Sequence, residues 1–233
     1  MVRLFAALWI LALAAAPARA QGCRLALVLA LDVSSSVDEV EYDLQRVGLA
    51  AALNAPEVRH ALLNGGTKAV ALSAYEWSGR DKQKVLLDWT LLQEEADIDR
   101  AVDALAGSQR SESEFPTAMG YSLGYAARML SRAPDCDRHV IDVSGDGVNN
   151  EGFGPRIAYR HFPLAGVTVN GLVILGHDDE VLGFYRNEVI RGRNAFVEIA
   201  DGFKDFRNAM TRKLYREIND IMLGGTIPPP PRG

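Results

Sequence analysis

The sequence contains little cysteine. Its two cysteines, Cys23 and Cys136, are too few for a cysteine-rich zinc module or a disulfide-dense small protein, although one disulfide remains possible. It also lacks a basic excess, because 25 Lys and Arg stand against 30 Asp and Glu, for a formal net charge of −5. A general nucleic-acid-binding protein would be basic, so this balance argues against that class. With 48% hydrophobic and 24% charged residues, the composition is that of a folded globular protein.

Sequence motifs of several enzyme classes are missing. The one Gly-x-Ser-x-Gly match, Gly120 to Gly124, lies within a predicted helical stripe and not at the strand-to-helix turn that serine hydrolases need. The chain also has no Gly-x-Gly-x-x-Gly dinucleotide loop after its first predicted strand. A phosphatase of the haloacid-dehalogenase type would carry a second acid two residues after Asp32, where this chain has Ser34. The histidines lack zinc-ligand spacing, and we interpret all of them as structural or surface residues. They are His60, His139, His161 and His177.

Long hydrophobic runs are missing after the start of the chain. Residues 4–16 are apolar and uncharged, they follow Arg3, and they precede Ala18-Arg19-Ala20, which matches an A-x-A cleavage site. This run is shorter than the roughly 20 residues that span a bilayer. We therefore predict that residues 1–20 are a secretory signal peptide, that the protein is exported, and that the mature chain has no membrane span. A lipoprotein signal ending at Cys23 is the weaker alternative.

Strand and helix patterns alternate over residues 23–222. Residues 25–31 are continuously apolar, which is typical of a strand buried on both faces. Further strands are predicted at 69–75, 85–92, 139–144, 167–175 and 195–199. Apolar stripes with helical spacing lie at 40–51, 98–105, 119–130, 181–190 and 206–218. This alternation predicts one α/β domain, a mostly parallel sheet with helices on both faces. Residues 223–233 are predicted to be a Pro-rich flexible tail.

Oxygen-bearing side chains are predicted to gather at one edge of this sheet. Asp32, Ser34 and Ser36 follow the first strand, Asp146 follows the fourth, and Thr117 precedes a helix. Ligands of such sheets bind beyond the carboxyl ends of the strands, so we expect these residues to lie close together. Two carboxylates and three hydroxyls are hard donors that suit Mg²⁺, Mn²⁺ or Ca²⁺ better than Zn²⁺. The hydroxyls add no charge, which would leave a bound cation able to hold a carboxylate of a partner.

Each of these residues also has a purely structural interpretation. Asp32 could cap a turn, and Ser36 could be a helix N-cap in a capping box with Glu39. Thr117 could likewise be an N-cap, and Asp146 could belong to a simple turn. Their combination favours the metal-site interpretation over the separate structural ones.

Two further residues are expected to be structural. Asp142 lies within an apolar strand, where an unpaired charge would be costly, so we expect it to be paired within the fold. A supporting role beneath the metal loops is the alternative for Asp142. Trp77 follows the second strand and is expected to pack in the core rather than line the metal edge.

The three motifs together resemble the metal-ion-dependent adhesion site of the von Willebrand factor type A domain. The family shows Asp-x-Ser-x-Ser after a buried first strand, a downstream Thr, and Thr-Asp-Gly after the fourth strand. The matching residues here are Asp32, Ser34, Ser36, Thr117 and Asp146. The third motif departs from the family pattern, because Gly145 stands where Thr is commoner. The resemblance covers residues 23–222 and is closest to compact, exported bacterial members without an assigned activity.

The resemblance implies a Rossmann-like three-layer sandwich. Its six-stranded sheet would be mainly parallel, with one antiparallel edge strand at 85–92 and helices on both faces. In this fold the first and fourth strands are neighbours, and Cys23 and Cys136 each directly precede one of them. The resemblance therefore implies a Cys23–Cys136 disulfide at the edge opposite the metal, which an exported protein can form.

The function that the resemblance implies is a non-enzymatic, divalent-cation-dependent protein-binding domain of the adhesion or scaffold type. Mg²⁺ is the expected cation, with Mn²⁺ or Ca²⁺ as alternatives, and a protein partner would supply an acidic side chain to it. The expected location is the bacterial periplasm or the cell exterior. Two alternatives stay open: a metal-dependent hydrolase built on the same sheet, and a structural protein whose metal loops are vestigial.

Overall fold

A computed structural model describes residues 22–223 of the chain, and for residues 220–223 only the backbone. The predicted signal peptide and nearly all of the predicted Pro-rich tail lie outside the described residues. Within residues 22–223, no helix has both the length and the apolar character needed to cross a membrane.

A six-stranded sheet forms the middle layer of the described residues, with the order β3-β2-β1-β4-β5-β6. Neighbouring strands pair in parallel except β2 and β3, which are antiparallel. The prediction of a mainly parallel sheet with one antiparallel edge strand is thus confirmed. The strands are β1 (Cys23–Asp32), β2 (Ala69–Trp77), β3 (Gln83–Leu92), β4 (His139–Gly145), β5 (Thr168–Ile174) and β6 (Val197–Ala200).

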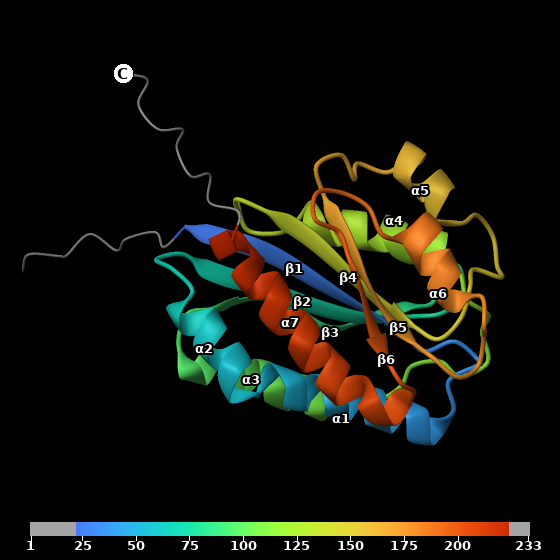
Figure 1. The fold of residues 1–233 in the computed structure, drawn as a ribbon, viewed down its shortest axis with the longest axis horizontal. Coiled ribbons are helices and arrows are strands. Elements are labelled where there is room, and N and C mark those ends of the chain that lie inside the picture. The colour runs from blue at the N-terminus through green and yellow to red at the C-terminus, as the bar shows by residue number, and fades with distance from the viewer. Residues whose placement is uncertain (1–21, 224–233) are drawn as a thin grey trace, which may run out of the picture.

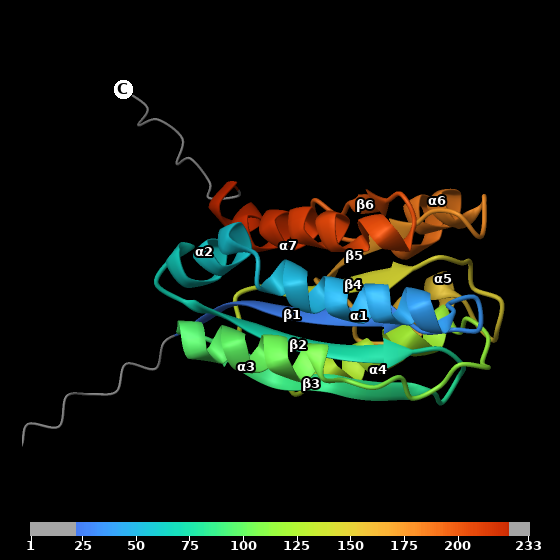
Figure 2. The ribbon, with the colours of Figure 1, turned by 90° about the horizontal axis from the view of Figure 1, so that it is seen from below.

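Helices cover both faces of the sheet (Figures 1 and 2). One face carries α1 (Glu39–Leu53), α2 (Pro56–Asn64), α3 (Glu95–Ala106) and α7 (Phe206–Leu223), which contact one another. The other face carries α4 (Met119–Leu130), α5 (Pro155–His161) and α6 (Val181–Phe184) with the π-helix η1 (Tyr185–Val189). A short 3₁₀ helix, η2 (Phe203–Asp205), precedes α7.

Strand β1 is apolar throughout because it supplies both helix layers. Leu27 and Leu29 belong to the apolar cluster beneath α1, α3 and α7, whereas Val28 and Ala30 belong to the cluster beneath α4 and α5. Successive side chains of a strand point to opposite faces, so a strand covered on both faces needs apolar residues at every position.

The predicted apolar stripe of the first helix differs from its buried face. Val40 and Val47 are 68% and 52% exposed, while Tyr42, Gln45 and Leu49 are buried. Gln45 is buried because its side-chain amide donates to the backbone carbonyl of Asp32 at 3.0 Å. Tertiary contacts thus select a face that hydrophobic spacing alone does not identify.

Several element boundaries also differ from the predictions. The capping box of α1 is formed by Asp38 and Glu41, not by Ser36 and Glu39. Pro56 begins helix α2, which was not predicted, and proline is favoured at a first helical position. The helix predicted at 181–190 is a single α-helical turn followed by a π-helix, and the last strand is Val197–Ala200 rather than 195–199. Helix α5 was not predicted.

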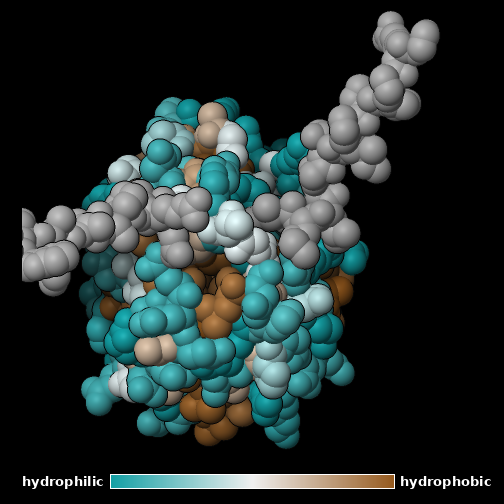
Figure 3. Space-filling model, turned by 90° about the vertical axis from the view of Figure 1, so that its left-hand side faces the viewer, coloured by the Kyte–Doolittle hydropathy of each residue, from teal (hydrophilic) through white to brown (hydrophobic). Residues whose placement is uncertain are grey.

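A disulfide joins Cys23 and Cys136, as the family resemblance implies. The two cysteines lie at the amino ends of β1 and β4, where the backbone NH of Asp137 donates to the Cys23 carbonyl at 3.0 Å. The amino-end side of the molecule is largely hydrophilic with separate apolar patches (Figure 3). Because each cysteine lies at the start of its strand, the disulfide links β1 and β4 at the edge away from Asp32 and Asp146.

Asp142 is paired inside the fold, as expected for a buried carboxylate. Its Oδ1 lies 2.9 Å from Nζ of Lys213, which also lies 2.7 Å from Oε1 of Glu217, and all three side chains are buried. Asn170 donates to the same Glu217 oxygen at 2.7 Å. Burial raises the pKa of Asp142 to about 7 despite the opposing effect of Lys213. Burial lowers the pKa of Lys213, but the two carboxylates outweigh this effect and raise it overall.

We predict that replacing both cysteines (C23S/C136S) strongly lowers stability. The disulfide closes a loop with a sequence separation of 113 residues. Chain-entropy arguments give a loss on the order of 4–5 kcal/mol in the free energy of unfolding, measured by urea denaturation. A reductant should destabilise the wild type and leave the double variant unaffected. Labelling of both cysteines in the unreduced protein by a thiol reagent would contradict the disulfide.

We also predict that Lys213→Met destabilises the fold by about 3–5 kcal/mol, because it leaves two buried carboxylates without a cation. Arg212→Met is the matched control. Arg212 is half-exposed and pairs with Glu198 at 2.8 Å, so its loss should cost less than about 1 kcal/mol. Urea denaturation of both variants measures the difference, and equal effects would contradict a structural role for the buried triad.

The loss in the free energy of unfolding that Lys213→Met causes, its stability deficit, should depend on pH. Without the lysine, which opposes the effect of burial, the pKa of Asp142 in the folded protein rises further above its unfolded value. The folded variant then binds more protons than the unfolded chain, and its stability falls as pH increases. The deficit should be larger at about pH 8 than at about pH 5. A deficit that is the same at both pH values would argue against this origin.

Candidate metal centre

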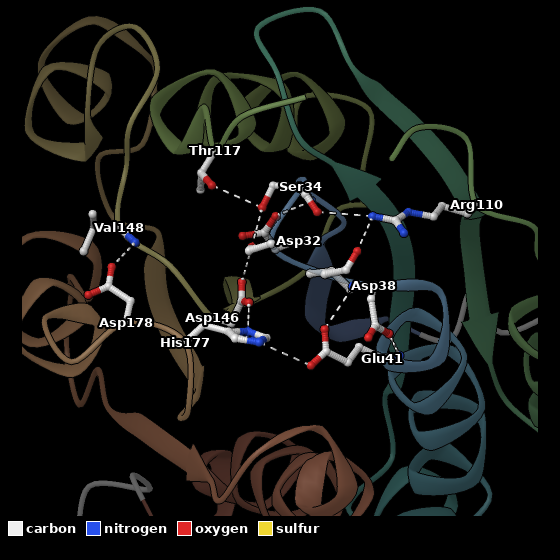
Figure 4. A network of polar contacts seen from close by, with 12 residues as sticks. Asp32, Ser34, Asp38, Glu41, Arg110, Thr117, Asp146, Val148, His177 and Asp178 are labelled. Atoms are coloured by element: carbon white, nitrogen blue, oxygen red, sulfur yellow. Dashed lines mark hydrogen bonds and ion pairs between the residues drawn. The ribbon is translucent and has the colours of Figure 1, made fainter. Parts of the chain in front are cut away.

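The five predicted residues meet at the carboxyl ends of β1 and β4. Figure 4 labels four of them, Asp32, Ser34, Thr117 and Asp146. Asp32 is the last residue of β1, and Asp146 directly follows the last residue of β4. Because these strands pair in parallel, with Leu31 opposite Ser144, their carboxyl ends lie side by side. Thr117 comes from the segment before α4, whose backbone is attached to the end of β2 by a 3.0 Å hydrogen bond from the NH of Ala118 to the carbonyl of Ser78.

A continuous series of hydrogen bonds connects four of the side chains. Thr117 Oγ1 donates to Ser34 Oγ at 3.1 Å, and Ser34 Oγ lies 3.2 Å from Ser36 Oγ. Ser36 Oγ in turn donates to Asp146 Oδ1 at 2.9 Å. The fifth side chain, Asp32, accepts a 2.8 Å hydrogen bond from the backbone NH of Ser34. Ser36 is exposed and the other four are buried, so the cluster opens to solvent on the Ser36 side.

The electrostatics of the cluster are unfavourable without a counter-charge. Asp32 is fully buried, and its Oδ2 has no hydrogen-bond partner among the described residues. Burial first, and then the neighbouring Asp146 carboxylate, raises the pKa of Asp32 to about 7, against the hydrogen bonds from Ser34. Two buried carboxylates of like charge are stable together only when protonated or when a positive charge neutralises them.

The donor set fits a hard divalent cation. It consists of two carboxylates and three hydroxyls, and one buried carboxylate oxygen lacks a partner. Over residues 22–223, no group of three or more His, Cys, Asp or Glu side chains could hold a metal ion. The fit therefore depends on the serine and threonine hydroxyls, which is the chemistry expected for Mg²⁺, Mn²⁺ or Ca²⁺ rather than for zinc.

Arg110 holds the first loop in place, a contact that sequence reasoning missed. Its guanidinium donates to three backbone carbonyls of the loop at 2.7–3.2 Å, those of Val33, Ser34 and Val37. On the Thr117 side, the Asn150 side chain accepts from the Thr117 backbone NH at 2.8 Å. These side chains fix the backbone that carries the hydroxyls, so contacts within the chain hold the cluster together.

His177 contacts the centre, although we predicted it to be structural or on the surface. Its Nδ1 lies 2.8 Å from Asp146 Oδ2, and its Nε2 lies 3.5 Å from Glu41 Oε1. The hydrogen bond with Asp146 is the main cause of its raised pKa. His177 comes from the loop after β5, 31 residues beyond Asp146, and no local sequence signal marks this contact.

Trp77 is fully buried, in agreement with its predicted core position.

Comparison with solved structures identifies the fold. PilB minor pilin from Streptococcus sanguinis aligns with a TM-score of 0.65 at 11% identity, over 91% of this chain and 65% of that one. A von Willebrand factor type A protein from Catenulispora acidiphila aligns with a TM-score of 0.57 at 18% identity, over 86% and 43% of the two chains.

A third similar structure is proximal thread matrix protein 1 from the mussel byssus, described with a zinc-occupied MIDAS motif. It aligns with a TM-score of 0.58 at 14% identity, over 86% of this chain and 48% of that one. The chain thus spans about half of the mussel protein and less than half of the Catenulispora protein. At these identities the likeness shows the fold alone, which is von Willebrand factor type A-like and resembles adhesins and matrix proteins.

Sequence comparisons place the chain in a family. No curated protein matches the sequence significantly. A family model described as "Protein of unknown function (DUF1194)" matches residues 22–222, which is nearly all of the described chain. The chain belongs to the DUF1194 family and has a von Willebrand factor type A-like fold.

Proposed function

We propose that the protein is an exported, non-enzymatic binding domain that recognises a protein partner through a divalent cation, with Mg²⁺ as the first candidate. Asp32, Ser34, Ser36, Thr117 and Asp146 would hold the cation. One observation carries this proposal: three distant segments bring two carboxylates and three hydroxyls into one cluster, in which the buried Asp32 Oδ2 has no partner. A bound divalent cation would neutralise both carboxylates and accept an acidic oxygen from a partner.

The residues of the proposed site have different roles. Asp32 and Asp146 supply the charge, while the three hydroxyls supply oxygen ligands without further charge. The exposed Ser36 side is the approach for a partner's carboxylate. Arg110, attached to the loop carbonyls, keeps the first motif in position before any ligand arrives. The site is therefore preorganised, which lowers the entropic cost of binding.

Export is supported by two observations. The described chain contains a disulfide, and structural disulfides persist mainly in oxidising compartments. Its fold resembles that of a pilin and of the pilus adhesin SpaC from Lactobacillus rhamnosus. Together with the predicted signal peptide, these observations favour the periplasm or the cell exterior as the place of action.

The first prediction tests the cation. Calorimetry should detect Mg²⁺ binding to the wild type, and saturating Mg²⁺ at about 100 times Kd should raise its free energy of unfolding by about 2.7 kcal/mol. Asp32→Asn, which keeps the side-chain volume, should abolish both effects while the chain remains folded. Asp137→Asn is the matched control, because Asp137 is exposed at the opposite edge of the sheet.

Two outcomes would contradict this assignment. Binding retained by Asp32→Asn would remove Asp32 from the site. A wild type that shows no cation-dependent change in stability would favour a structural protein with vestigial metal loops. Turnover of a generic phosphoester, lost in Asp32→Asn, would instead favour a metal-dependent hydrolase.

A second prediction tests the partner. Immobilised wild type should retain a protein from the exported fraction in Mg²⁺ and release it when a chelator is added. Asp32→Asn should retain none of it under either condition. If the partner contributes a carboxylate, excess acetate should compete, whereas excess acetamide, which has no carboxylate, should not. Retention that survives the chelator would show that binding does not pass through the cation.

A further inference from the structure

Gly145 occupies a position where a side chain has no room. A Cβ built on Gly145 would lie 2.8 Å from Oδ2 of Asp32 and 2.8 Å from the hydroxyl oxygen of Tyr185. Both distances are shorter than the contacts that real Cβ atoms make. The third motif usually carries Thr at this position, and here the hydroxyl of Tyr185 lies 2.8 Å from the point where that side chain would begin.

Two glycines on neighbouring strands leave room for the Tyr185 ring beside Gly145. Tyr185 begins the π-helix η1, a type of element that often marks functional sites, and it is fully buried. A Cβ on Gly171 would lie 2.5 Å from Cδ1 of its ring. Gly171 and Gly145 belong to the paired strands β5 and β4. Two glycines on adjacent strands thus leave the space through which the ring reaches the metal centre.

Tyr185 and Asp32 present an unmatched donor and an unmatched acceptor to one another. Within the described part of the chain, neither the Tyr185 hydroxyl nor Asp32 Oδ2 has a hydrogen-bond partner, and both atoms are buried. A buried polar group without a partner costs about 1–3 kcal/mol. Both atoms border the same small space, because each lies 2.8 Å from the Cβ position of Gly145.

We propose that Tyr185 is a positioning residue of the metal centre, whose hydroxyl donates to Asp32 Oδ2 and holds this carboxylate in place when the site is loaded. The inference rests on the proposed cation site and adds a residue that lies outside its motifs. Asp32 Oδ1 is already held by the backbone NH of Ser34. Each carboxylate oxygen has two lone pairs, so Oδ2 can accept from the phenol and still contact the cation. Groups that orient a metal ligand commonly change metal affinity 10- to 100-fold when removed.

The test compares Tyr185→Phe with the wild type by Mg²⁺ calorimetry and by thermal unfolding in chelator. We expect Kd to rise about tenfold in the variant. In chelator the melting temperature should stay the same or rise, because the hydroxyl that is removed has no partner in the apo fold. A tyrosine with a merely structural role would not separate these two measurements.

Tyr75→Phe is the matched control. Tyr75 is also fully buried, but its hydroxyl donates to the Ser122 carbonyl at 2.8 Å. Tyr75→Phe should therefore melt at a lower temperature in chelator and keep the wild-type Kd. The two variants are expected to show opposite patterns.

Two results would overturn the proposal for Tyr185. The first is a Tyr185→Phe variant whose Kd stays within about twofold of the wild type, far below the expected change. The second is a variant that loses apo stability and affinity together. Both leave the cation site intact, because the wild type still binds Mg²⁺. A wild type that binds no Mg²⁺ would overturn the cation site, and this inference with it.

Discussion

The parallel pairing of β1 with β4 is the constraint on which both ends of the molecule depend. Parallel neighbours place like ends together, so the residues that precede the two strands meet at one edge and those that end or follow them meet at the other. At the amino edge, this pairing brings Cys23 to Cys136. At the carboxyl edge, it brings Asp32 to Asp146. A covalent attachment thus stabilises the same pair of strands whose other ends carry two buried like charges.

The buried carboxylates differ in the partners that compensate their charge. Asp142 has a lysine partner, and Glu76 accepts from the backbone NH of Ser111 at 2.6 Å. Asp32 has hydrogen bonds from Ser34 and the weaker influence of the Arg110 charge, but the neighbouring Asp146 carboxylate acts against it and its Oδ2 has no partner among the described residues. Asp142 and Glu217 share a buried lysine, whereas no ion pair to Asp32 is found among the described residues, so a cation from outside the chain would supply the missing charge. This contrast is the physical argument for a cation, independent of any family resemblance.

Much of the fold could be predicted because it follows from local patterns. The continuous apolar run of β1 and the alternation of strands and helices gave the layered sheet, and motif spacing brought together residues that the structure places in one cluster. The exposure of Val40 and the contact of His177 with Asp146 could not be predicted, because they depend on how distant segments pack. The same holds for Tyr185, which reaches the centre only because Gly171 and Gly145 leave room for it.

Binding and stability should be closely coupled in such a site. Without a ligand, the folded chain retains two buried carboxylates close together and the unmatched hydroxyl of Tyr185, and each lowers the stability of the apo state. A cation that binds only the folded state removes part of this cost, so adding the cation should raise the free energy of unfolding. The disulfide supplies stability that allows the carboxyl edge to remain unfavourable until a cation binds.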